Sequence, residues 1–122
     1  MKQNEKPFVI ALDLGGTNSV FGIVDSSGEI KASTSIKTQA YTTVEEYVAA
    51  SCQAVMTIVE ETGGMENIKA MGIGAPSANY YRGTIENADN LVWGKGIVPL
   101  AKLFEDKLGV PVALTNDANA AA

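Results

Sequence analysis

The sequence has no histidine, and this absence excludes more chemistry than any other feature of its composition. A Ser-His-Asp triad and a histidine-bearing metal site are both excluded within the chain. A general base must therefore be a carboxylate, a lysine, a tyrosine or the lone thiol. That thiol is Cys52, and because one cysteine cannot form an internal disulfide, a reducing, cytoplasmic location is expected.

Basic residues and long apolar runs are also scarce. Nine lysines and arginines stand against fourteen acidic residues, so nucleic acid is not an expected partner of a chain with net charge −5. The chain starts with polar residues, and no window approaches the run of about 18 apolar residues that a membrane helix needs, so no membrane association is expected. With 122 residues, 46% of them hydrophobic and 19% charged, the sequence predicts one folded domain.

Hydrophobic patterning predicts an α/β domain that opens with strands. Residues 8–12 form an apolar run with β-branched members, which is typical of a strand buried on both faces. Residues 20–24 and 30–36 predict two more strands, joined by a turn in which Gly28 can adopt a positive φ. The pattern therefore predicts a three-stranded antiparallel meander.

Helices and strands alternate in the rest of the chain. Apolar residues spaced three and four apart predict an amphipathic helix over residues 44–62, with Thr42–Glu45 and Thr43–Glu46 as alternative capping boxes. The later segments predict a strand over 68–75, a long loop, a helix over about 97–108, a strand over 110–114 and the start of a third helix over 116–122. Right-handed crossovers make the last two strands parallel to the first, and we expect the two complete helices to cover both faces of this mixed sheet.

Adjacent glycines, Gly15 and Gly16, follow the first predicted strand after Asp13 and Leu14. Their backbone N–H groups can approach an anion because no Cβ intervenes, and Thr17 and Asn18 add side-chain donors. Asp13, at the end of the strand, could hold Mg²⁺ through water. The same composition is typical of a tight hairpin, so these residues alone leave phosphate binding and a plain turn both open.

Other glycine patterns of nucleotide-binding proteins fail in this sequence. Residues 72–77 nearly match the dinucleotide pattern G-x-G-x-x-G, but Ser77 occupies its last position and Pro76 does not open a helix. The pattern G-x-x-x-x-G-K-[ST] is absent. Trp93 is the one tryptophan, and it is more typical of a core or loop anchor than of a sugar platform.

Asn116 and Asp117 lie where the last strand meets the third helix. An aspartate at this junction faces the crevice above the sheet, and the helix N-terminus favours its ionised form. Such a carboxylate can accept the proton of a hydroxyl that attacks a phosphoryl group. These residue types are also the usual helix N-cap, worth about 1 kcal/mol, and composition alone favours the cap.

Taken in order, three segments resemble the N-terminal domain of the ROK family (repressors, open-reading-frame proteins, kinases), and bacterial glucokinases especially. The segments are residues 11–18, residues 72–76 running on to 90–91, and residues 108–122. The resemblance implies the actin-like ATPase (ribonuclease H-like) fold, with β-β-β-α-β-α-β-α topology and a mixed five-stranded sheet of order 3-2-1-4-5. It also implies that residues 1–122 are a truncated N-terminal sugar-kinase domain, inactive without the C-terminal domain.

The activity implied by the resemblance is ATP-dependent phosphorylation of a hexose, glucose foremost, giving glucose 6-phosphate. Asp117 would be the catalytic base, and the phosphate-binding residues, with Mg²⁺ near the first of them, would be Asp13, Gly15, Gly16, Thr17 and Asn18. The sugar would contact Ser77, Asn90, Asn116 and Asp117. The implied partners are sugar and ATP in a homo-oligomer, with zinc expected only in the C-terminal part.

Departures from the family pattern leave the sugar open. Ser77 stands where the family usually has glycine, and Asp89 where it usually has proline. The alternatives are a kinase for N-acetylglucosamine, N-acetylmannosamine or fructose, and a sugar-responsive transcriptional repressor of the same family.

Overall fold

The computed structural model describes residues 6–75, 78–79, 82–86, 88, 91, 93–94 and 96–116, without the side chains of Thr115 and Asn116. Its elements are β1 (Phe8–Leu14), β2 (Asn18–Asp25), β3 (Ile30–Lys37), the short 3-10 helix η1 (Thr38–Ala40), α1 (Val44–Glu61), η2 (Met65–Asn67), β4 (Ile68–Ala75), β5 (Ala78–Asn79), β6 (Thr84–Glu86), β7 (Ile97–Val98), α2 (Leu100–Leu108) and β8 (Val112–Asn116). None of the described helices has the length and apolar character needed to cross a membrane.

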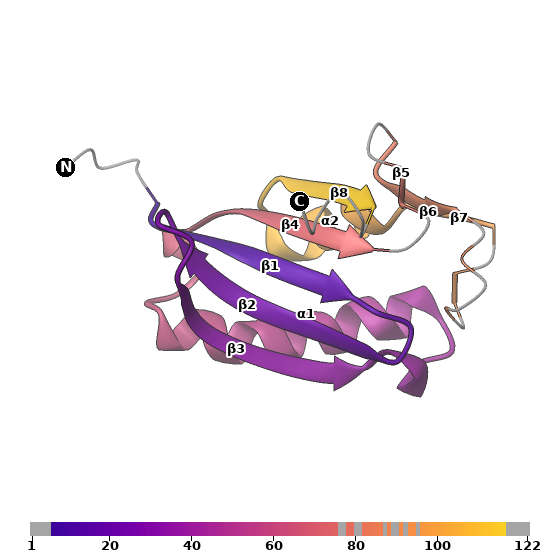
Figure 1. Cartoon of the computed structure of the whole chain (residues 1–122), viewed down its shortest axis with the longest axis horizontal. Helices are drawn as coiled ribbons and strands as arrows, with labels where there is room; N and C mark the ends of the chain where they lie inside the picture. The colour runs from indigo at the N-terminus through magenta and orange to yellow at the C-terminus, as the bar shows by residue number, and fades with distance from the viewer. Residues whose placement is uncertain are drawn as a thin grey trace.

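The main sheet confirms the expected topology. Its five strands lie in the order β3-β2-β1-β4-β8, so β8 is the fifth strand of the sequence prediction (Figure 1). β2 is antiparallel to both β1 and β3, whereas β4 is parallel to β1 and β8 is parallel to β4. Asn116 belongs to β8 rather than to a third helix, and the expected start of that helix at 117–122 lies outside the described residues.

Both long helices lie on the same face of the sheet, which corrects the expectation that they cover both faces (Figure 1). The crossovers β3–α1–β4 and β4–α2–β8 run in the same direction across the sheet, so right-handedness puts both helices on one side. β1 shows the consequence: Leu12 and Leu14 are buried beneath the helices, whereas Ala11 and Asp13 on the other face are exposed. The prediction of a strand buried on both faces is therefore wrong for β1 among the described residues.

The hydrophobic core fills the space between the sheet and the two helices. The sheet contributes inward-facing residues such as Phe21 and Ile73, α1 contributes Val55 and Val59, and α2 contributes Phe104. In α1 the buried residues recur at helical spacing, which confirms the amphipathic pattern. The helix begins at a capping box in which Thr43 Oγ1 accepts from Glu46 N at 3.2 Å, so Thr43–Glu46 is the box that forms.

The segment between β4 and α2 departs most from the prediction. The expected long loop contains β5 and β6, which form a small antiparallel sheet with β7 at the expected start of the helix. α2 begins at Leu100 rather than near residue 97, because a proline disfavours helical geometry in the residue before it, and Val98 precedes Pro99 in extended β7. The helix ends as expected at Gly109, which has a φ of 74°.

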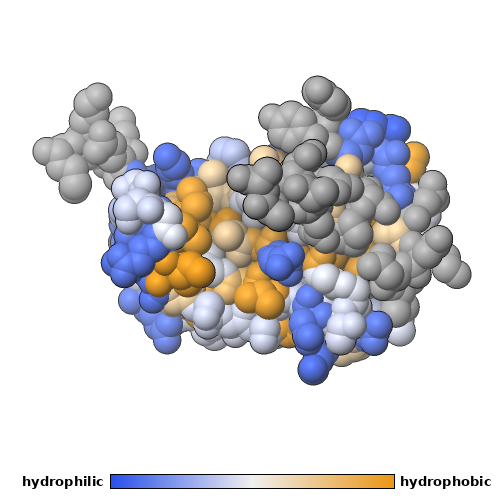
Figure 2. Space-filling view, viewed as in Figure 1, coloured by the Kyte–Doolittle hydropathy of each residue, from blue (hydrophilic) through white to orange (hydrophobic). Residues whose placement is uncertain are grey.

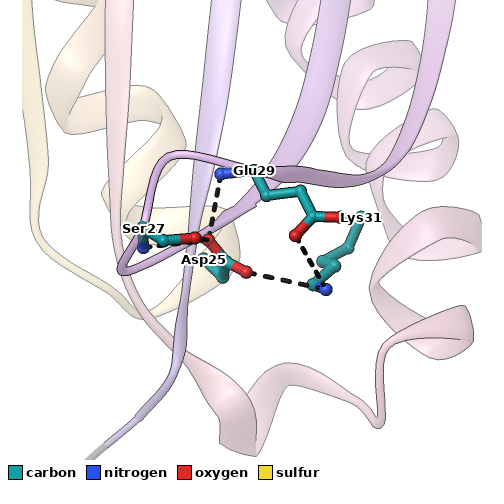
Figure 3. Close-up of polar contacts among 4 residues, drawn as sticks. All are labelled: Asp25, Ser27, Glu29 and Lys31. Atoms are coloured by element: carbon teal, nitrogen blue, oxygen red, sulfur yellow. Dashed lines mark hydrogen bonds and ion pairs between the residues drawn. The ribbon is translucent and has the colours of Figure 1, made fainter.

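The hairpin between β2 and β3 lies at the other end of the sheet from the carboxyl end of β1 (Figures 1 and 3). Asp25 Oδ1 accepts hydrogen bonds from Ser27 N at 2.9 Å, Ser27 Oγ at 2.7 Å and Glu29 N at 3.0 Å, and Lys31 Nζ lies 3.6 Å from Asp25 Oδ2. These contacts, Ser27 Oγ foremost, lower the pKa of Asp25 to about 2. Gly28 has the expected positive φ, 88°.

Candidate active site

The carboxyl ends of β1, β4 and β8 share one edge of the main sheet, and of the predicted site residues Asp13 and the backbone of Asn116 lie on the strands that end there (Figure 1). In the strand register, Asp13 pairs with Gly74, and the next residue of β4, Ala75, pairs with Asn116. Because neighbouring strands lie about 4.8 Å apart, the ends of β1 and β8 are separated by about 10 Å across β4. The glycine turn after β1 and the backbone of Asn116 at the end of β8 therefore lie at the same edge of the sheet, with β4 between their strands.

Gly15 is required by the geometry of the turn itself. Its N–H donates to the Asn18 carbonyl at 3.0 Å, closing the turn between β1 and β2. A Cβ at Gly15 would lie 2.9 Å from that same oxygen, closer than real Cβ atoms are found. The N–H of Gly15 is therefore not available to an anion. The backbone N–H groups of the turn that remain are those of Gly16 and Thr17, which donate no hydrogen bond within the described part of the chain.

Asp13 lies beside this turn on the face that neither described helix covers. Its side chain is exposed and makes no hydrogen bond or ion pair within the ranges that the structure describes. The described residues hold no cluster of three or more metal-ligating side chains, and Asp13 is the carboxylate that the described part of this edge offers to Mg²⁺. That donor set fits Mg²⁺, which proteins commonly bind through one or two carboxylates together with substrate phosphates and water.

The predicted sugar side is described only in part. Ser77, Asn90 and Asp117 lie outside the described residues, and of Asn116 only the backbone is described. Their contacts with sugar and the role of Asp117 as base therefore stay predictions. The structure places the backbone of Asn116 at the shared edge, one residue before Asp117.

Trp93 is a core anchor, as its sequence context suggested. Its side chain is buried, and its ring lies over that of Tyr47 with 4.6 Å between the centroids and a tilt of 31°. Backbone hydrogen bonds fold the surrounding segment tightly, from Ala88 N to the Gly94 carbonyl at 2.9 Å and from Gly94 N to the Leu91 carbonyl at 3.0 Å. The ring thus ties the segment that precedes β7 to α1.

Sequence reasoning missed a chain of buried hydroxyl groups beside the glycine turn, formed by Ser19, Thr38 and Tyr47. The predicted second strand begins at residue 20, which leaves Ser19 out of it. A signal is present, because Ser19 shares the strand parity of Phe21 and Ile23, both of which are buried. A hydroxyl at an inward position needs a hydrogen-bond partner.

A second missed feature is the carboxylate of Glu86 on the small sheet, which is surrounded by polar side chains. Glu86 Oε2 accepts from Thr84 Oγ1 at 2.6 Å and from Asn79 Nδ2 at 3.1 Å, and it lies 3.6 Å from Arg82 Nη1. These contacts, that of Thr84 foremost, lower the pKa of Glu86. The cluster ties β5 to β6 beside the carboxyl end of the main sheet.

Comparison with known proteins places the chain in one family. The family model described as the ROK family matches residues 9–122. The glucokinase of Streptomyces coelicolor is 38% identical over 114 residues, which make up 93% of this chain and 33% of that protein. The chain thus spans about a third of the length of the curated glucokinase that it matches.

Solved structures share the fold. A ROK family glucokinase from Streptomyces griseus, in complex with glucose and AMPPNP, has a TM-score of 0.79 and 36% identity over 93% of this chain and 34% of its own. A ROK family transcriptional regulator, a homologue of the E. coli MLC protein, has a TM-score of 0.78 over 98% of this chain and 30% of its own. Its identity is 15%, so that likeness shows the fold alone.

Proposed function

Because the chain belongs to the ROK family of sugar kinases and regulators, which have the actin-like ATPase fold, we propose that it is the N-terminal part of an ATP-dependent hexose kinase with glucose as its preferred sugar. The observation that carries this proposal is the shared sheet edge, where the glycine turn after β1 and the backbone of Asn116 at the end of β8 flank the end of β4. The choice of glucose is supported by the relatives from Streptomyces coelicolor and Streptomyces griseus, which are 38% and 36% identical and are both named glucokinases.

Each element at this edge has a role in phosphoryl transfer. The N–H groups of Gly16 and Thr17 bind phosphate oxygens, and Asp13 would hold Mg²⁺ through water. ATP with Mg²⁺ supplies the γ-phosphoryl group when bound. Asp117 accepts the proton of the sugar hydroxyl, and Asn116, with Ser77 and Asn90, orients the sugar so that this hydroxyl faces the phosphoryl group.

The strand register supports this assignment of roles. β4 separates the end of β1 from the end of β8, so the proposed phosphate side at the glycine turn and the proposed sugar side at Asn116 are about 10 Å apart. We propose that residues 1–122 are inactive alone, since the matched glucokinases are about three times as long. We also propose a cytoplasmic location, supported by the single, half-buried Cys52, and a homo-oligomeric protein. Zinc would bind outside this sequence, which has one cysteine and no histidine.

The test is a coupled kinase assay of the full-length protein with ATP and a panel of sugars. The panel holds glucose, N-acetylglucosamine, N-acetylmannosamine and fructose, and the highest kcat/KM is expected for glucose. A higher value for another member would reassign the sugar but keep the reaction. If no sugar is phosphorylated while calorimetry shows glucose binding, the kinase proposal fails and a sugar-responsive repressor takes its place.

A further inference from the structure

Three buried hydroxyl groups form a continuous chain beside the glycine turn. Ser19 Oγ lies 2.7 Å from Tyr47 Oη on one side and 2.7 Å from Thr38 Oγ1 on the other. The three residues are at most 1% exposed, and they come from the start of β2, from α1 and from η1. Short hydrogen bonds in a site shielded from water hold their groups in a fixed geometry.

This chain of hydroxyls meets the turn from both sides. The N–H of Thr38 donates to the Thr17 carbonyl at 2.9 Å. Ser19 follows Asn18, whose carbonyl accepts the N–H of Gly15 and so closes the turn. The backbone of Gly16 and Thr17, which carries the proposed phosphate-binding N–H groups, therefore lies between two contacts. One is the hydrogen bond from Thr38 N to the Thr17 carbonyl, and the other is the hydrogen bond from Gly15 N to the Asn18 carbonyl beside Ser19.

Within the row of three hydroxyl groups, Tyr47 is the residue whose side chain packs in the aromatic part of the core. Its ring packs over Trp93 with 4.6 Å between centroids, and Tyr41 meets it edge-on at 6.4 Å and 68°. Desolvation raises the pKa of Tyr47 to about 12, so its hydroxyl stays protonated in ordinary buffers. The position of the hydroxyl is thus set by the packing of α1, not by the turn that it supports.

We propose that Tyr47 is a positioning residue for the nucleotide, acting through Ser19 and Thr38 to hold the N–H groups of Gly16 and Thr17 in the orientation that binds phosphate. This proposal rests on the proposed kinase function. Oriented donors stabilise an anion more than mobile ones, because the cost of ordering them is met during folding. Loss of the Tyr47 hydroxyl should therefore weaken nucleotide binding while the sugar side is unaffected.

The test compares Tyr47→Phe and Ser19→Ala with wild type in the full-length protein. Tyr47→Phe keeps the ring on Trp93 and removes only the hydroxyl, whereas Ser19→Ala removes the middle of the chain. The matched control is Tyr41→Phe, because the Tyr41 hydroxyl belongs to the same aromatic cluster but makes no hydrogen bond to the turn among the described residues. The quantities measured are the KM for ATP, the KM for glucose, kcat and the Kd for AMPPNP by calorimetry.

We expect Tyr47→Phe and Ser19→Ala each to raise the KM for ATP and the Kd for AMPPNP by about tenfold, with the KM for glucose unchanged. The double variant should bind AMPPNP about as tightly as the single variant with the lower affinity, since both changes break the same hydrogen-bond network. If Tyr47 and Ser19 only stabilised the fold, the variants would instead lower the apparent kcat because less enzyme is folded, and the KM for ATP and the KM for glucose would both be unchanged.

The outcomes separate this proposal from the kinase function. Equal AMPPNP affinity in wild type and Tyr47→Phe overturns the positioning role, whether or not sugar is phosphorylated. Wild type that binds AMPPNP but phosphorylates no sugar overturns the kinase function alone. Wild type that binds no AMPPNP overturns both.

Discussion

At the hairpin between β2 and β3, one carboxylate organises the turn, and its titration is the simplest check on the structure. The contacts from Ser27, Glu29 and Lys31 stabilise ionised Asp25 (Figure 3). The pKa falls from 3.8 to about 2 on folding, so the folded chain gains stability from ionised Asp25 above about pH 3.8. That contribution is lost as the pH falls through the window from 3.8 to about 2.

A carboxyl-carbon NMR titration should therefore give Asp25 a pKa of about 2. Ser27→Ala should raise it, because the Ser27 hydroxyl makes the largest contribution to the shift. A wild-type titration at the ordinary value of 3.8 would show that the hydrogen bonds in the turn do not form in solution.

The glycine turn gives a second prediction at the residue scale. In the full-length enzyme, Gly16→Val places a branched side chain beside the N–H groups proposed to bind phosphate. We expect the KM for ATP to rise with little change in the KM for the sugar, because only the nucleotide side is obstructed. Circular dichroism of the variant confirms folding, and an unchanged KM for ATP in a folded variant would make the turn a plain hairpin.

Individual site residues were predictable from the sequence only where a motif carried them. Gly15 and Gly16 stand out as a pair two residues after an apolar run, and the structure gives a steric reason for glycine at position 15. Ser19 and Thr38 did not stand out, because their partners lie on separate elements and meet only after folding. Such contacts depend on tertiary packing, which local sequence patterns do not encode.

At the scale of elements, the strand order was predicted from the family resemblance and is confirmed, whereas the prediction that the helices cover both faces is wrong. Hydrophobic runs located the five strands of the main sheet, turn residues predicted the meander of the first three, and crossover handedness made the last two parallel to the first. Applied to both crossovers together, the same rule places α1 and α2 on one face. The strands β5, β6 and β7 escaped prediction because two or three residues are too few to show a period of two.

The face of the main sheet opposite the helices carries exposed apolar side chains (Figure 2). Val20 is 46% exposed and Ile30 is 64% exposed, and Val20 pairs in register with Asp13, which is exposed on the same face. Exposed apolar area of this kind drives association when nothing covers it. The isolated 122-residue chain should therefore self-associate through this face.

Sedimentation velocity over a concentration series tests this prediction. Ile30→Lys should shift the chain towards monomer, because a charge on the face disfavours its burial in a contact. Ile97→Lys is the matched control, since Ile97 is 56% exposed but lies on β7 of the small sheet. Equal association of the two variants would exclude the main sheet face as the contact.

At the scale of the whole molecule, the described residues form one wall of the proposed phosphoryl-transfer site. The chain matches about a third of each glucokinase, so the other groups that surround the substrates belong to the remaining two-thirds of such an enzyme. The wall brings the proposed phosphate-binding turn and the backbone of Asn116, which precedes the candidate base in the sequence, to one sheet edge. If this wall serves phosphoryl transfer, Asp117 must act in catalysis and not only as a helix cap.

The most direct test of this claim is the kcat of the full-length Asp117→Asn variant in the coupled assay with ATP and glucose. Asparagine caps helices about as well as aspartate, so the unfolding midpoint should be nearly unchanged. It cannot accept the hydroxyl proton, so kcat should fall by roughly 10²–10⁴. Asp25→Asn, the same substitution at the far end of the sheet, should leave kcat unchanged. A kcat within a few-fold of wild type in Asp117→Asn would contradict the proposed role, because another group would then have to be the base.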